Sequence, residues 1–182
     1  MLRQTLTICI LGLAMTALYA QQSPPASGAA PATPGAPAAG AAGAAGGTMT
    51  PVQRADATPK GQLKNPYSDG DAAAVQAGQK LYMSYGCSGC HGGTGGGGMC
   101  PALTNDVWVY GGDDDTLFRL IAYGSEVMQG KGYSRKGQEN VVGAMPPMGQ
   151  IVKTDDDMWH ILAFVRSNYH GAPECKLGCE AK

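Results

Sequence analysis

The chain has few large aromatic side chains and almost no net charge. Among its 182 residues only 2 are Phe whereas 28 are Gly, and the formal net charge is −1. So much glycine means that the chain cannot be evenly globular, and we expect one domain with appendages. A charge this close to zero argues against nucleic-acid binding, which needs a basic surface.

Apolar residues larger than Ala or Pro are absent from 23–47, which consists almost entirely of Ala, Gly and Pro. Such a segment cannot bury enough surface to offset the entropy lost on ordering. Glycine does not recur at every third position, so a collagen helix is excluded. We therefore predict a disordered linker over 21–66.

Long apolar runs are also scarce, and the sequence has one, Leu6–Leu18. Arg3 precedes the run and Ala20 follows it, which is the pattern of a secretory signal peptide. We expect residues 1–20 to be removed, an uncleaved anchor being the alternative. The mature protein is then expected to be periplasmic, without stable membrane insertion.

Five cysteines follow the predicted signal peptide, and two of them belong to the motif that carries the chemistry. Cys87-Ser88-Gly89-Cys90-His91 is a C-x-x-C-H sequence, the signature of covalent haem attachment. A redox dithiol would need a strand before Cys87, and a structural zinc site would need a second ligand pair of similar spacing. We predict one haem c, with thioether bonds from Cys87 and Cys90 and with His91 as an iron ligand.

Apolar residues at spacings of three and four, together with capping residues, predict three helices. Acidic runs at Asp113–Asp115 and Asp155–Asp157 fall where two of them begin, and the helix dipole favours anions there. We expect both runs to be caps, partner binding being the second interpretation. The predicted helices are Asp71–Tyr85, Thr116–Tyr123 with Gly124 as its stop, and one from Thr154 or Asp155 to about Tyr169.

With these features in place, the chain from about Asp71 to Gly171 resembles class I cytochromes c. Gly78 and Tyr82 match the glycine and the aromatic residue of that family's N-terminal helix, and Ile161 and Phe164 match the C-terminal helix that crosses it. The resemblance implies an all-α fold in which these two helices cross beside a covalent haem. It also implies a cytochrome c domain over 67–172 and a C-terminal tail over 173–182.

The Pro-x-Leu sequence that starts at Pro101 resembles the one that follows the haem motif in this family. There the proline carbonyl accepts the N–H of the haem histidine, here His91. The residue before that proline is commonly glycine, and in this chain it is Cys100.

Cys100, Cys175 and Cys179 can form at most one disulfide. The class I arrangement implies a bond from Cys100 to the tail, a local Cys175–Cys179 bond being the alternative.

The sequence around Met145, Gly-Ala-Met-Pro-Pro-Met, resembles the loop that carries the family's axial methionine. Met148 is the neighbouring alternative and Met128 a more distant one. A His/Met pair leaves no open coordination position for a substrate and raises the reduction potential. The resemblance therefore implies an electron carrier and not an enzyme. A haem subunit of a periplasmic oxidoreductase and a gas-sensing haem module are the alternatives.

Two shorter stretches resemble cytochromes of the cL type, which accept electrons from periplasmic quinoprotein alcohol dehydrogenases. They are 106–111, which includes Trp108 and Tyr110, and the run from Trp159 to Arg166. The resemblance implies a dehydrogenase with pyrroloquinoline quinone (PQQ) as the electron donor and a downstream cytochrome or oxidase as the acceptor. It leaves open whether Trp108 and Tyr110 donate to a haem propionate or only pack beside the ring.

Overall fold

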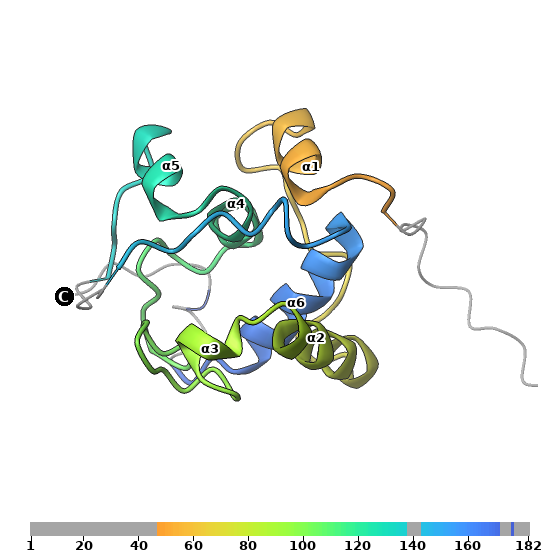
Figure 1. The fold of residues 1–182 in the computed structure, drawn as a ribbon, viewed down its shortest axis with the longest axis vertical. Coiled ribbons are helices and arrows are strands. Elements are labelled where there is room, and N and C mark those ends of the chain that lie inside the picture. The colour runs from red at the N-terminus through yellow and green to blue at the C-terminus, as the bar shows by residue number, and fades with distance from the viewer. Residues whose placement is uncertain (1–46, 138–142, 172–175, 177–182) are drawn as a thin grey trace, which may run out of the picture. The chain divides into compact units, whose positions relative to one another are not determined.

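The structure, a computed structural model, describes residues 47–137, 143–171 and 176, all within a compact unit that spans Gly40–Lys182. These residues form helices and no strand, so the predicted all-α class is confirmed (Figure 1). The predicted signal peptide and the first part of the predicted linker lie outside the described residues. The helices are α1 Pro51–Ala57, α2 Ala72–Ser84, α3 Ser88–His91, α4 Asp114–Tyr123, α5 Ser125–Gly130 and α6 Asp155–Ser167.

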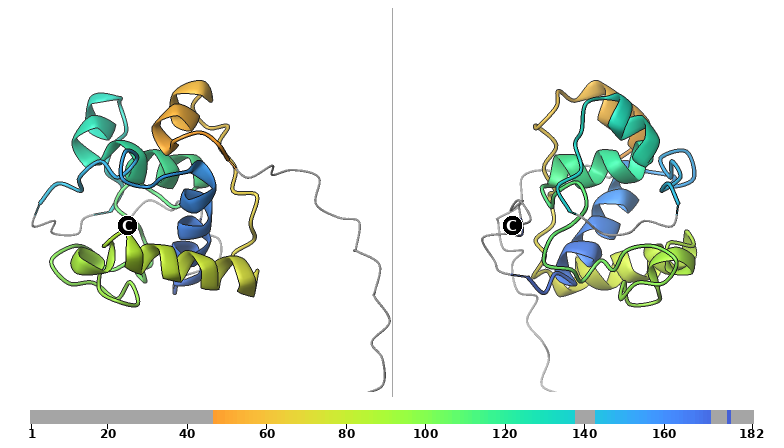
Figure 2. Two further views of the ribbon diagram at one scale, coloured as in Figure 1. Left: turned by 45° about the vertical axis from the view of Figure 1, so that its right-hand side comes forward. Right: turned by 90° about the vertical axis from the view of Figure 1, so that its left-hand side faces the viewer.

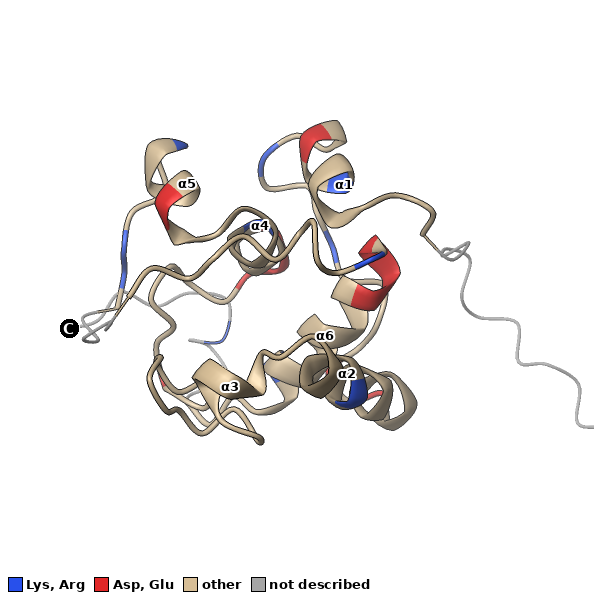
Figure 3. Cartoon of the chain, in the orientation of Figure 1, with Lys and Arg blue, Asp and Glu red and all other residues tan. Residues whose placement is uncertain are grey.

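The three predicted helices are α2, α4 and α6, and each begins at a capping side chain. Asp71, Asp113 and Thr154 each accept a hydrogen bond from a backbone N–H two or three residues later. These bonds satisfy N–H groups that have no partner within the helix. Acidic residues fill the first turns of α4 and α6, as Figure 3 shows for α6. Asp113 therefore caps α4, whereas the run 155–157 lies in the first turn of α6, just after its cap Thr154. Two members of these runs, Asp115 and Asp155, are also buried and paired with arginines.

Helices α2 and α6 cross at Gly78, and the crossing is close because that position has no side chain. A Cβ at Gly78 would overlap the carbonyl oxygen of His160 and would lie 3.0 Å from the Cβ of Phe164. One turn further along α2, the rings of Tyr82 and Phe164 pack with 5.0 Å between their centroids. This is the crossing that the resemblance implies, and the class I cytochrome c fold is confirmed.

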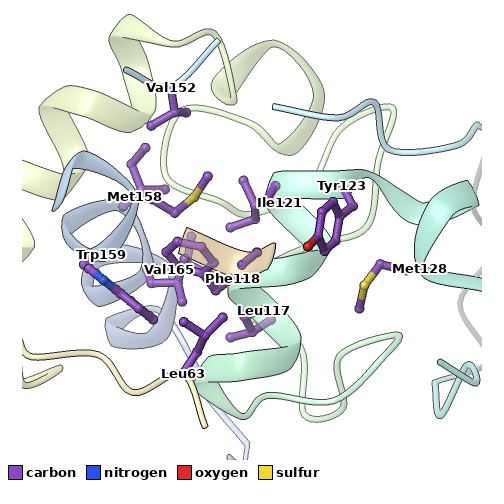
Figure 4. Close-up of a cluster of buried hydrophobic side chains, with 14 of the residues drawn as sticks. Leu63, Leu117, Phe118, Ile121, Tyr123, Met128, Val152, Met158, Trp159 and Val165 are labelled. Carbon is purple, nitrogen blue, oxygen red and sulfur yellow. The ribbon is translucent and has the colours of Figure 1, made fainter. Parts of the chain in front are cut away.

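The main apolar core lies between α4 and α6 (Figure 4). The rings of Phe118 and Trp159 have centroids 4.3 Å apart, and Met158 and Leu162 are fully buried beside them. Leu63, from the chain that precedes α2, closes this core and is also buried. Burial of each such side chain stabilises the fold by roughly 1.5–3 kcal/mol, so the position of α4 is well determined.

Residues 47–66 are folded, which corrects the predicted linker over 21–66. Thr50 and Gln53 form a capping box at the start of α1, and Pro51 occupies the first helical position, where its missing N–H removes no helical bond. The Ala/Gly/Pro composition ends at Gly47, and the linker prediction was wrong beyond that residue because the sequence there again carries capping and apolar residues.

A buried charge pair fastens this segment to α4. Arg119 donates to Asp115 Oδ2 at 3.0 Å and to the carbonyl oxygens of Ala55 and Thr58 at 2.7 and 2.6 Å. Asp115 also accepts from the backbone N–H of Leu63 at 3.2 Å. Burial raises the pKa of Asp115, but the hydrogen bonds from Arg119 and from backbone N–H groups outweigh burial and lower the pKa below its ordinary value of 3.8. The carboxylate is therefore ionised at neutral pH.

Of the predicted C-terminal tail, Lys176 is described, and its Nζ lies 2.8 Å from Asp69 Oδ2. Cys100 forms no disulfide with another described residue. Its predicted partners Cys175 and Cys179 lie outside the described residues, so the disulfide stays a prediction. Within the described ranges, none of the helices has the length and apolar character needed to cross a bilayer.

We predict that Gly78→Ala destabilises the domain by about 2 kcal/mol, because the added methyl group forces α2 and α6 apart. Denaturant unfolding of the haem-loaded protein measures this. Gly130→Ala is the matched control, since a Cβ at Gly130 meets nothing within 4 Å. Equal stability of the two variants would contradict a close crossing at Gly78.

We predict that Asp115→Asn costs about 3 kcal/mol at pH 7, because it leaves the Arg119 charge buried without its counter-ion. The folded-state pKa of Asp115 is lowered, so its contribution is complete above the unfolded pKa of about 3.9 and is lost as the pH falls through the folded pKa. The difference between variant and wild type should therefore shrink below about pH 4. Chemical unfolding at several pH values tests this, with the exposed Asp106→Asn as the control. A difference that persists unchanged at low pH would contradict it.

Candidate functional site: a cavity between the Cys-x-x-Cys-His helix and the methionine loop

A cavity with a volume of about 460 Å³ lies among the described residues, and this volume is within the range of cofactor sites. Its walls are mostly apolar. Helix α4 contributes Leu117, Leu120 and Ile121, and α6 contributes Ile161 and Val165. In Figures 1 and 2, α3 lies away from the segment 143–154, which passes alongside α4. Residues of the α3 region and of the segment 143–154 both line the cavity. Two separate parts of the chain therefore form opposite walls for the candidate ligands.

Cys87 and His91 line the cavity together. The carbonyl of Cys87 accepts from the backbone N–H of His91 at 3.1 Å, which forms the single turn of α3. Residues four apart share one face of a helix, so the turn brings the thiol and the imidazole to the same wall. Cys90 is not among the lining residues; its carbonyl accepts from the N–H of Cys100 at 3.1 Å, and the Cys100 side chain does line the cavity.

The tautomer of His91 follows from its hydrogen bond. His91 Nδ1 lies 2.9 Å from the carbonyl oxygen of Pro101, and a carbonyl oxygen can only accept. Nδ1 therefore carries the proton in the neutral ring, and Nε2 keeps a lone pair. That is the nitrogen a metal would use, and the bond also fixes the orientation of the ring.

Tyr82 contributes to the site, although the sequence suggested only a packing role for it. Its hydroxyl donates to the carbonyl of Gly92 at 2.7 Å, immediately after His91. Burial raises the pKa of Tyr82 to about 12, so the phenol remains protonated and continues to donate at neutral pH. The sequence could have indicated this hydrogen bond, because the family's aromatic position holds a tyrosine here, and tyrosine has a hydroxyl that phenylalanine lacks.

Of the three methionines considered as iron ligands, the structure favours one. Met145 lines the cavity, whereas Met148 and Met128 do not. Met128 is fully buried in the core, and Met148, like Met145, is partly buried against the core. Ser125, at the start of α5, lines the cavity next to Met145 and hydrogen-bonds to it. No sequence pattern linked these two residues, which are 20 positions apart.

Trp108 and Tyr110 both line the cavity but differ in their hydrogen bonds. The indole N–H of Trp108 donates to the carbonyl of Leu103 at 2.9 Å, so this arrangement favours packing over donation to a propionate. The Tyr110 hydroxyl accepts from Gln129 at 2.8 Å, which leaves its own hydrogen to donate. Arg135 also lines the cavity. The sequence did not predict this, because a single arginine in a loop belongs to no recognisable motif.

These residues fit a haem. The apolar walls suit a porphyrin ring, and the histidine with a free Nε2 and the methionine thioether suit low-spin iron. Cys87 at the wall supplies the thiol chemistry for covalent attachment. The polar residues at the rim, Gln129 and Arg135 among them, suit ionised carboxylates.

The sequence profile of the cytochrome c family matches residues 75–168. The chain belongs to that family: it is an electron-transfer c-type cytochrome, and it binds haem c covalently. Members of the family are generally electron carriers and not enzymes.

Two curated relatives are subunits of cbb3-type cytochrome c oxidases. Subunit FixP of Sinorhizobium medicae is 34% identical over 95 residues, which are 52% of this chain and 30% of the relative. Subunit CcoP of Rubrivivax gelatinosus is 29% identical over 111 residues, 60% of this chain and 31% of the relative. The chain thus spans about a third of the length of these proteins. Among solved structures, cytochrome cL of Methylophaga aminisulfidivorans is 32% identical with a TM-score of 0.44, over 59% of this chain and 61% of that one.

Proposed function

We propose that this protein is a periplasmic mono-haem electron carrier. Cys87 and Cys90 hold the haem by thioether bonds, and His91 and Met145 bind the iron from its two sides. The observation that carries the proposal is the cavity, which Cys87, His91 and Met145 line together. When bound, the haem iron accepts a single electron and releases it again.

The residues around the proposed ligands suit a carrier that rearranges little between oxidation states. His91 is held by the Pro101 carbonyl, and the far end of the methionine loop is held to α4: the N–H of Met148 donates to Ile121 at 2.9 Å. With both axial positions filled by protein ligands, no position is left for a substrate. The protein is therefore proposed to pass electrons and to catalyse no reaction of its own.

The proposed donor is a PQQ-dependent alcohol dehydrogenase, and the proposed acceptor is a downstream cytochrome or oxidase. The resemblance of 106–111 and 159–166 to cL-type cytochromes supports the donor. The chain from 81 to 105, which includes α3, contains no charged residue, and Figure 3 shows α3 uncharged. An uncharged surface around the haem-attachment helix α3 suits the small, short-lived contacts of electron carriers.

A second candidate is a haem-containing subunit of a periplasmic oxidoreductase, such as an oxidase. It is favoured by the two curated relatives, both of which are named as subunits of cbb3-type oxidases. A subunit would remain bound to its complex during purification, whereas a diffusible carrier would separate from it. The haem site is the same in both candidates.

We predict that Met145→Ala abolishes the weak sulfur-to-iron band at the red end of the oxidised spectrum and lowers the reduction potential, because the soft thioether favours reduced iron. Met148→Ala should leave both unchanged, and it is the matched control three residues away. If the two variants behave the other way round, Met148 is the ligand.

We predict that a reduced PQQ-dependent alcohol dehydrogenase from the same organism reduces this cytochrome within one turnover. Stopped-flow absorbance of the haem measures the rate, and a dehydrogenase without its quinone is the control. Absence of reduction, together with stable co-purification with an oxidase, would favour the second candidate.

A further inference from the structure

The loop that carries Met145 has few hydrogen bonds of its own. Pro146 and Pro147, the next two residues, have no N–H to donate. Prolines restrict the backbone angles of the loop, but they do not fix its place against the rest of the domain. The N–H groups of Met148 and Gly149 attach the loop to α4 beyond the prolines. A ligand must be held to within a fraction of an ångström, so Met145 itself also needs an attachment.

Ser125 supplies it through two reciprocal hydrogen bonds. The backbone N–H of Met145 donates to Ser125 Oγ at 3.0 Å, and the backbone N–H of Ser125 donates to the carbonyl of Met145 at 3.0 Å. Ser125 is the first residue of α5, where the N–H has no partner within the helix. The two bonds together fix both the position and the rotation of the Met145 backbone.

Gly124 allows this close approach. It has a positive φ of 77° at the corner between α4 and α5. A Cβ at this position would lie 2.6 Å from the carbonyl oxygen of Met145 and 2.8 Å from the nitrogen of Pro147. Any side chain here would push the loop outward. Gly124 and Ser125 together therefore form a methionine seat.

The methionine seat is itself firmly placed. Ala122, two residues before it, and Met128, three residues after Ser125, are both fully buried. The N–H of Met128 donates to the carbonyl of Gly124 at 3.2 Å, and the N–H of Gly149 donates to the carbonyl of Ala122 at 3.1 Å. The core thus supports the seat from both sides.

We infer that Ser125 is a positioning residue for the axial methionine: its hydroxyl holds the Met145 backbone where the thioether reaches the iron. The inference rests on the proposed function, since it takes Met145 as the ligand. Without the hydroxyl, Met145 leaves the iron more readily and a competing ligand enters more easily.

The test is a titration of the oxidised, haem-loaded full chain with imidazole, which competes with Met145 for the iron. Ser125→Ala should bind imidazole about five-fold more tightly, the effect of one lost hydrogen bond, and its sulfur-to-iron band should weaken. Ser125→Thr keeps the oxygen and should resemble wild type. Ser84→Ala is the matched control, because Ser84 Oγ donates to the Leu81 carbonyl at the surface of α2.

Two further variants, Met145→Ala and Ser125→Cys, distinguish a wrong ligand assignment from a wrong role for Ser125. If Met145→Ala leaves the sulfur-to-iron band intact, the proposed ligand is wrong and the inference falls with it. If Met145→Ala abolishes the band while Ser125→Ala binds imidazole as wild type does, only the positioning role is overturned. Should Ser125→Ala fail to carry haem, Ser125→Cys keeps the shape with a weaker acceptor. Its imidazole affinity should then lie above that of wild type, and a wild-type value would overturn the role.

Discussion

The close contact of α2 with α6 at Gly78 is the constraint on which the haem site depends. Helix α2 leads within three residues to Cys87 and hence to His91, and α6 follows the methionine loop and lines the cavity with Ile161. The separation of the two helices therefore controls how the two walls of the cavity face each other. A glycine at the crossing removes the side chain that would hold them apart, and interiors packed at crystal density leave no room to absorb a change there.

The folded segment 47–66 supports the site indirectly. Its attachment to α4 runs through Arg119, whose charge is satisfied by Asp115 and by the Ala55 and Thr58 carbonyls. A buried pair of this kind adds little net stability compared with apolar residues, but removal of one partner is costly. Helix α4 in turn carries three residues of the cavity wall and ends at the corner that holds Met145.

The sequence was sufficient for the features that depend on local patterns. The helices capped by Asp71, Asp113 and Thr154 could be predicted because caps and apolar spacing are local, and the C-x-x-C-H motif is local as well. Helix α1 was missed because the linker was predicted to extend to residue 66, although the Ala/Gly/Pro-rich composition ends at Gly47. The pair of Ser125 with Met145 could not be predicted, because it depends on a glycine corner that brings together residues 20 positions apart.

The most direct measurement is mass spectrometry of the mature protein after acid–acetone treatment, with peptide mapping of the haem. The account predicts that the haem stays on the polypeptide, that the mass equals the chain plus one haem, and that the peptide containing Cys87 and Cys90 carries it. Extraction of the haem, or its recovery on a peptide that contains Cys100 instead, would contradict the account.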